Sequence, residues 1–165
     1  MNPMQTVLDA AARGDVDSLR SLLQSSSPDQ VRADSDPNEL SALHLAAAGG
    51  HVDAMRFLLS PEVGSDSNCT RINNFAPLHS AAMQGHTAAC ELLLDSGANV
   101  NMQTEPQGYA PLHSASFGGH VETVRLLIAR GGDTSLRNYR DEQPIDTAKR
   151  QNQGDVIAAI TELTA

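Results

Sequence analysis

The sequence has 165 residues, a length that suits one compact domain or a short array of repeats. Hydrophobic residues make up 40% of the chain but aromatic residues only 3%, which favours a core of small and aliphatic side chains between closely packed helices. The formal net charge of −9 disfavours nucleic-acid binding, which needs a basic surface, and no run approaches the roughly 18 apolar residues of a membrane helix.

Three segments of the chain share one pattern. They read SALHLAAAGGHVDAMRFLLS (41–60), APLHSAAMQGHTAACELLLD (76–95) and APLHSASFGGHVETVRLLIAR (110–130). Their first histidines are 35 and then 34 residues apart, and their second histidines keep those intervals. The pairs are His44 and His51, His79 and His86, and His113 and His120. A fixed pattern that recurs at a near-constant period indicates stacked repeat units.

The shared pattern, x-P-L-H-x-A-x-x-x-G-H followed by a leucine pair, resembles the ankyrin repeat. This resemblance implies an all-α solenoid of helix-turn-helix units joined by β-hairpin-like fingers. It also implies that the histidines hydrogen-bond between helices and neighbouring loops. The two histidines of a pair lie seven residues apart, not at the i, i+4 spacing of a helical zinc pair, so we expect neither a metal nor a cofactor.

The units follow one another in chain order as a single domain. We predict an N-terminal cap over 1–35, full repeats over 36–70, 71–104 and 105–137, and a C-terminal cap over 138–165. In the caps, Asp15, Asp146 and Gln153 replace histidines. A terminal unit with a polar face is what an array needs, because no neighbour covers that face. With both caps present, we expect a complete array rather than a fragment.

Within a unit, proline is expected at the first helical position, where its missing N–H would have no partner. A glycine then lets the chain turn back sharply, and another ends the second helix. The turn glycines are Gly14, Gly50, Gly85 and Gly119, and the terminating glycines are Gly64, Gly97 and Gly131. The segment 25–39, rich in Ser, Asp and Pro, predicts an extended, mobile loop.

The position before each first helix departs from the family pattern, which has threonine there. In this chain it holds Ser41, Ala76, Ala110 and Gln143. Losing a hydroxyl cap costs about 1 kcal/mol. We therefore expect the second and third full repeats to be less stable than is usual in the family.

Nothing in the sequence points to catalysis. The phosphate-binding GxxxxGK[ST] loop and the GxSxG elbow are both missing. By repeat register Cys90 faces the core and Cys69 lies in a loop, so neither is a good nucleophile and no disulfide framework is indicated. We predict that the chain is not an enzyme and that it works in a reducing compartment, the cytoplasm or the nucleus.

The resemblance implies a concave binding face made of finger tips and the exposed sides of the first helices. By register, the partner-contacting positions include Leu40, Phe75 and Tyr109 on fingers and Met83 and Phe117 on helices. Aromatic and methionine side chains suit an interface because they bury much apolar area with few rotors to freeze. The alternative is that Phe75 and Tyr109 merely pack on the adjacent finger.

Charge is distributed unevenly along the chain. Residues 1–70 hold ten acids and four bases, a net of −6, whereas residues 71–165 hold ten acids and seven bases, a net of −3. A partner lying along the concave face would meet acidic groups at one end, and Arg140 and Arg150 at the other. This asymmetry would favour one orientation. The alternative is that the acidic loop only aids solubility.

These observations predict a monomeric, non-catalytic protein-binding module, an adaptor, inhibitor or chaperone that binds a protein or peptide. Two narrower hypotheses stay open. The beginning of the chain is similar to a fungal ankyrin chaperone of a basic ribosomal protein, and the size and capping are similar to small kinase-inhibiting ankyrin proteins. A hypothesis of another class makes the chain a substrate. Asn101 resembles the finger asparagine hydroxylated in some ankyrin proteins, although Asn99 stands where an acid is preferred.

Overall fold

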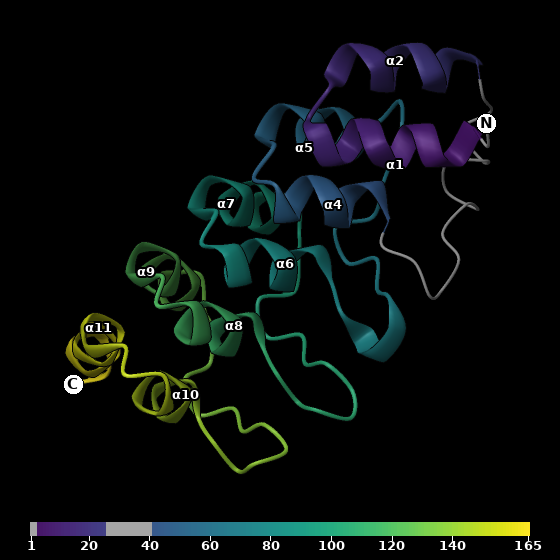
Figure 1. Ribbon diagram of the computed structural model, residues 1–165. Coiled ribbons are helices and arrows are strands. Elements are labelled where there is room, and N and C mark those ends of the chain that lie inside the picture. Colours follow the sequence, from purple (N-terminus) through teal and green to yellow (C-terminus); the bar gives the residue numbers. More distant parts are fainter. Residues whose placement is uncertain (1–2, 26–40) are drawn as a thin grey trace.

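The computed structural model describes residues 3–25 and 41–165, and it is helical (Figure 1). The helices are α1 (Pro3–Arg13), α2 (Val16–Ser25), α4 (Ala42–Ala48), α5 (Val52–Leu59), α6 (Pro77–Gln84), α7 (Thr87–Asp95), α8 (Pro111–Gly118), α9 (Val121–Ala129), α10 (Pro144–Arg150) and α11 (Gly154–Thr164), with a 3₁₀ turn η1 (Ile72–Asn74). The predicted all-α repeat architecture is confirmed. No helix of the described chain is both long enough and apolar enough to cross a bilayer.

The helices form two layers. The first helices of the units, α1, α4, α6, α8 and α10, pack side by side in chain order, and the second helices, α2, α5, α7, α9 and α11, do the same behind them (Figure 1). The connections that follow α5, α7 and α9 project to one side of the first layer as long loops (Figure 1). The molecule therefore offers a surface bounded by the first helices and these fingers.

Small side chains let the first helices approach closely. Ala46, Ala47, Ala81, Ala82 and Ala115 are fully buried between the layers. The second helices fill the remaining space with larger residues, among them Leu58, Leu93 and Leu127, which are also fully buried. Each buried leucine contributes about 1.5–3 kcal/mol relative to an exposed one, so the stack depends on these contacts between units.

The sharp turn between the two helices of a unit requires glycine. Gly85 has a φ of +73°, and a Cβ built on it would lie 2.4 Å from the His120 ring. His120 belongs to the following unit, and its Nε2 donates to the carbonyl oxygen of Met83 at 2.9 Å. The glycine therefore provides both the left-handed backbone and the space that the next unit's histidine occupies.

One predicted helix end is wrong. Gly64 was expected just past the second helix of its unit, but α5 ends at Leu59, with Ser60 as its C-cap. Pro61 follows, and because proline has no N–H it cannot continue the hydrogen-bond ladder. Gly64 does have a positive φ of +67°, in the turn that comes after the helix.

Where an alanine stands at the N-cap, a histidine side chain forms a hydrogen bond with the backbone of that alanine. The backbone N–H groups of Ala76 and Ala110 donate to Nδ1 of His79 and His113, at 3.1 and 3.2 Å. At Ser41, the hydroxyl lies 2.7 Å from Nδ1 of His44. One N–H at each alanine cap is thus satisfied, although the hydroxyl acceptor of the family pattern is missing.

In the described part of the chain, the fingers are hairpin-like loops rather than regular β-structure. Among the described residues the only recorded bridge pairs Arg71 with Phe75, and further single backbone bonds run from Thr104 to Tyr109 and from Asn138 to Glu142. Apart from Ser25, which ends α2, the loop predicted over 25–39 lies outside the described residues, as does Leu40.

Candidate functional site

A groove of about 590 Å³ opens between two fingers and the first-layer helices α6 and α8. We call this feature the groove. The residues that line it are Arg71, Ile72, Asn73, Phe75, Met83, Thr104, Gln107, Tyr109, His113, Ser114 and Phe117. It therefore brings together four of the residues predicted from register, two from fingers and two from helices.

Phe75 is held at the base of its finger by two histidine rings. Its ring centroid is 6.3 Å from that of His44 and 5.3 Å from that of His79, both in stacked geometry. Its carbonyl oxygen accepts a hydrogen bond from Nε2 of His44 at 2.9 Å. Phe75 thus both packs against the fingers and lines the groove, so the two interpretations of this residue are compatible.

Tyr109 occupies the same position one unit later. Its carbonyl oxygen accepts from Nε2 of His79 at 3.0 Å. Its ring makes edge contacts with His113 and with Tyr139, at centroid distances of 5.9 and 6.0 Å. Partial burial raises the pKa of its hydroxyl, which therefore stays protonated at neutral pH.

Met83 and Phe117 project from the last turns of α6 and α8, and their carbonyls are also held by the following unit. Met83 accepts from His120 at 2.9 Å, and Phe117 accepts from the Gln153 amide at 3.4 Å. The side chain of Phe117 is 43% exposed, which is unusual for a residue of this size. All four predicted groove residues therefore have carbonyls bound by a neighbouring unit.

The histidines that organise this site are buried and neutral. Burial lowers the pKa of both His44 and His79 to about 4, and it also lowers the pKa of His113. Because Nδ1 of His79 accepts the Ala76 N–H, its proton must sit on Nε2, where it serves Tyr109 and Met102. No group of three or more potential metal ligands occurs within residues 3–25 and 41–165.

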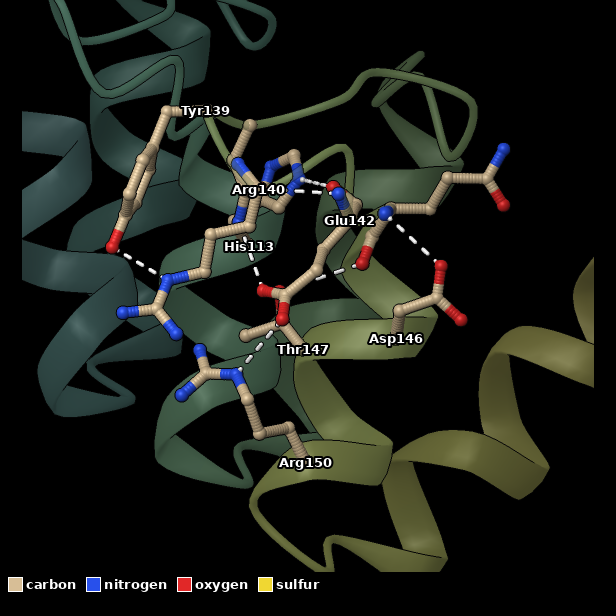
Figure 2. Close-up of polar contacts among 9 residues, drawn as sticks. His113, Tyr139, Arg140, Glu142, Asp146, Thr147 and Arg150 are labelled. Carbon is tan, nitrogen blue, oxygen red and sulfur yellow. Dashed lines mark hydrogen bonds and ion pairs between the residues drawn. The ribbon is translucent and has the colours of Figure 1, made fainter.

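Arg140 lies on the last finger and Arg150 on α10 (Figure 2), and both are close to Tyr109. Nε of Arg140 donates to the Tyr139 hydroxyl, and the guanidinium lies 5.1 Å from the centroid of that ring. Nε of Arg150 donates to a carboxylate oxygen of Glu142 at 3.1 Å. Of the predicted site residues in the described chain, these two do not line the groove.

Sequence reasoning missed Ile72, which is 51% exposed and lines the groove. It lies in η1, whose path is set by the positive φ angles of Asn73 and Asn74. An apolar residue before two asparagines in a finger was the available signal. The repeat periodicity does not predict the exposure of Ile72, because this residue belongs to no regular α-helix.

Comparison with known proteins places the whole pattern in a family. A family described as ankyrin repeats (3 copies) matches residues 7–104 and 63–138. The chain is 31% identical to the RelA-associated inhibitor of Mus musculus over 66% of its own length and 12% of that protein. It is 39% identical to ankyrin repeat domain-containing protein 37 of Bos taurus over 53% of each chain. It is also 38% identical to protein phosphatase 1 regulatory subunit 12A of Mus musculus over 33% of this chain and 5% of that protein.

The chain thus spans about half or less of each of these relatives. The family match, in contrast, extends over most of the described residues and includes every proline, glycine and histidine position of the three full repeats. On that coverage, and with a two-layered stack of helix pairs in hand, the chain belongs to the ankyrin-repeat family.

Proposed function

We propose that the protein is a non-catalytic interaction module that binds an apolar side chain of a protein partner in the groove. The observation that carries this is the position of Phe117, 43% exposed and gathered with Phe75, Met83 and Tyr109 around one cavity. A hollow that gathers several apolar side chains at the surface is typical of a protein-binding site. Fixed carbonyls behind the side chains favour binding, because little ordering is needed when the partner arrives.

The names of two relatives favour a regulatory role. One is called an inhibitor and another a regulatory subunit. We extend only this role to the present chain, and not the targets of those proteins. The free thiols of Cys69 and Cys90 are consistent with a partner in the cytoplasm or nucleus.

Two of the alternative hypotheses, the chaperone of a basic protein and the hydroxylase substrate, receive less support. A chaperone of a basic protein would be expected to present carboxylates to its client, yet none of the described residues that line the groove is a carboxylate. For the substrate hypothesis, the Asn101 amide donates to Gly131 at 3.0 Å and accepts from the Asp133 N–H at 2.8 Å. A hydroxylase would have to displace both bonds. An intact mass from the native source with no +16 species would count against that hypothesis.

The test uses a random dodecapeptide display library panned against the full chain, with affinities of selected peptides measured by fluorescence anisotropy. We expect Phe117→Ala to weaken binding by about tenfold, because truncating an aromatic anchor removes most of its contact area. Leu163→Ala on α11 is the matched control, since Leu163 has the same exposure of 43% and lies outside the groove lining. Equal affinities for the wild type and Phe117→Ala, with unchanged circular dichroism, would refute the proposal.

A further inference from the structure

We propose that the partner segment carries an Asp or Glu side chain next to its apolar anchor, and that this carboxylate binds Arg140 and Arg150 at the Tyr109 end of the groove. This inference rests on the proposed function, because it assumes that the groove holds the anchor. It names the chemistry of the partner and the direction in which the segment lies.

The first argument is the charge of the groove itself. The chain as a whole carries a net charge of −9, yet among the described residues no carboxylate lines the groove, and Arg71 is the only formally charged one that does. The acidic side chains of the described chain therefore lie outside the groove lining. A neutral or acidic segment can enter it without meeting a like charge.

The second argument is the state of Arg140. Its Nε is used by the Tyr139 hydroxyl, and its guanidinium lies 5.1 Å from the Tyr139 ring centroid. These contacts hold the side chain in place, and none of them neutralises its charge. No ion pair involving Arg140 is recorded in the described part of the chain, whereas Arg137, Lys149 and Arg150 each have a carboxylate within 4 Å.

Arg150 completes the pair from the neighbouring helix. Its Nε is bonded to Glu142 (Figure 2). The other carboxylate oxygen of Glu142 accepts from Asn138 at 3.2 Å. Glu142 is thereby fixed in the finger and holds Arg150 in a defined direction. Two arginines against one carboxylate leave about one unit of positive charge at this corner, enough to favour an incoming carboxylate.

Tyr109 lies between the groove and the pair formed by Arg140 and Arg150. Its ring lines the cavity and contacts Tyr139, the same ring that supports Arg140. Both Arg140 and Arg150 are close enough to act on the pKa of the Tyr109 hydroxyl, although burial dominates and raises it. An apolar anchor beside Tyr109 would thus have its neighbouring residue within reach of the arginines.

The opposite end of the array gives the segment its direction. Residues 1–70 carry a net charge of −6 and residues 71–165 a net charge of −3. An acidic group is repelled least at the α10 end, where the arginine pair also lies. We therefore expect the carboxylate to point toward α10 and away from α1.

The test compares matched peptides on the full chain. Each peptide selected from the dodecapeptide library is synthesised as the acid and as its amide, with Asp→Asn or Glu→Gln in the consensus. We expect the acid to bind the wild type about fivefold more tightly at low ionic strength, with a smaller difference at high salt. In Arg140→Gln the acid and amide should bind with nearly equal affinity.

Arg56→Gln is the control, because it makes the same charge change at an exposed position on α5. It should keep the preference for the acid. A consensus without acidic residues, a consensus rich in Lys and Arg, or an acid preference that survives in the Arg140→Gln/Arg150→Gln double variant would overturn the inference. If those peptides still depend on Phe117, the proposed function stands; if no selected peptide does, both fail.

Discussion

Nε2 of His79 donates to the carbonyl oxygen of Tyr109 at 3.0 Å, across the boundary between two units. The other ring nitrogen of His79 accepts the N–H of Ala76 at 3.1 Å. One side chain therefore closes the start of α6 and fixes the finger residue that lines the groove. The histidine repeat, which first identifies the array, also positions its candidate binding surface.

Removing the hydrogen bonds of His79 should destabilise the whole stack. In His79→Phe, the buried Ala76 N–H loses its acceptor and the carbonyls of Met102 and Tyr109 lose a donor, although the Tyr109 carbonyl keeps the Thr104 N–H. A buried polar group left without its partner costs about 1–3 kcal/mol. We expect the free energy of unfolding from urea titration to fall by about 2–4 kcal/mol. A variant as stable as the wild type would mean that these groups find other partners.

Stability should fall on mild acidification. The folded-state pKa of His44 and His79 is about 4, below the ordinary value of 6.5, so the unfolded chain takes up protons first. Their contribution is complete above about pH 6.5 and is lost as pH falls toward 4, by at most about 1.4 kcal/mol per pH unit for each histidine.

Urea unfolding between about pH 7.5 and about pH 4.5 measures this dependence. His79→Phe should show a shallower slope than the wild type, because one of the titrating groups is gone. The aspartates with lowered pKa values, Asp15, Asp133 and Asp146, act only near and below 3.8 and so do not mask the effect. Unchanged stability from pH 7.5 to 5 would contradict the assignment of neutral, buried histidines.

Two glycines with similar backbone angles should tolerate alanine differently. Gly85 and Gly97 have φ angles of +73° and +87°, so alanine at either costs about 1–2 kcal/mol for the left-handed conformation. Only at Gly85 would the new methyl group strike a neighbour, the His120 ring, whereas nothing lies within 4 Å at Gly97. We expect a clearly larger loss of stability for Gly85→Ala in parallel urea titrations.

Combining Gly85→Ala with His120→Ala separates the two causes. If the clash accounts for the excess, the double variant should lose less than the sum of the single losses. Strictly additive effects would show that the ring is not what rejects the methyl group.

The thiols should be slow to react while the chain is folded. Burial raises the pKa of Cys90 to about 12 and also raises that of Cys69, so little thiolate exists at neutral pH. With Ellman's reagent, we expect two equivalents of thiol to appear quickly only in denaturant. In the native protein Cys90, which is fully buried, should react more slowly than Cys69. Rapid native labelling of Cys90 would contradict this.

Much of the fold could be predicted from residues whose chemistry suits only one position in a helix. Pro77, Pro111 and Pro144 stand at the starts of α6, α8 and α10, as expected of residues without an N–H. The predicted end of α5 was wrong because Gly64 matches the repeat pattern, whereas Pro61, which has no N–H, ends the helix earlier. A pattern shared between units hides such differences in the connections.

The candidate site was only partly predictable, for a related reason. Phe75, Met83, Tyr109 and Phe117 occupy register positions, so the repeat alone brings them together. The pairing of Arg150 with Glu142 joins a helix to a finger eight residues away, and Ile72 depends on a turn made by two asparagines. Such contacts come from the path of each finger, which register does not encode.

The contact between a glycine of one unit and the histidine of the next has a consequence for how repeats can be added to such a chain. His51 packs on Gly14, His86 on Gly50 and His120 on Gly85, while Gln153 takes that place on Gly119. Every full unit thus has a glycine that receives a side chain of the next unit and a histidine that packs on the glycine of the preceding unit. A duplicated unit, such as 71–104, would therefore carry a glycine for the following unit and a histidine for the preceding one. It could lengthen the protein without any change to its neighbours.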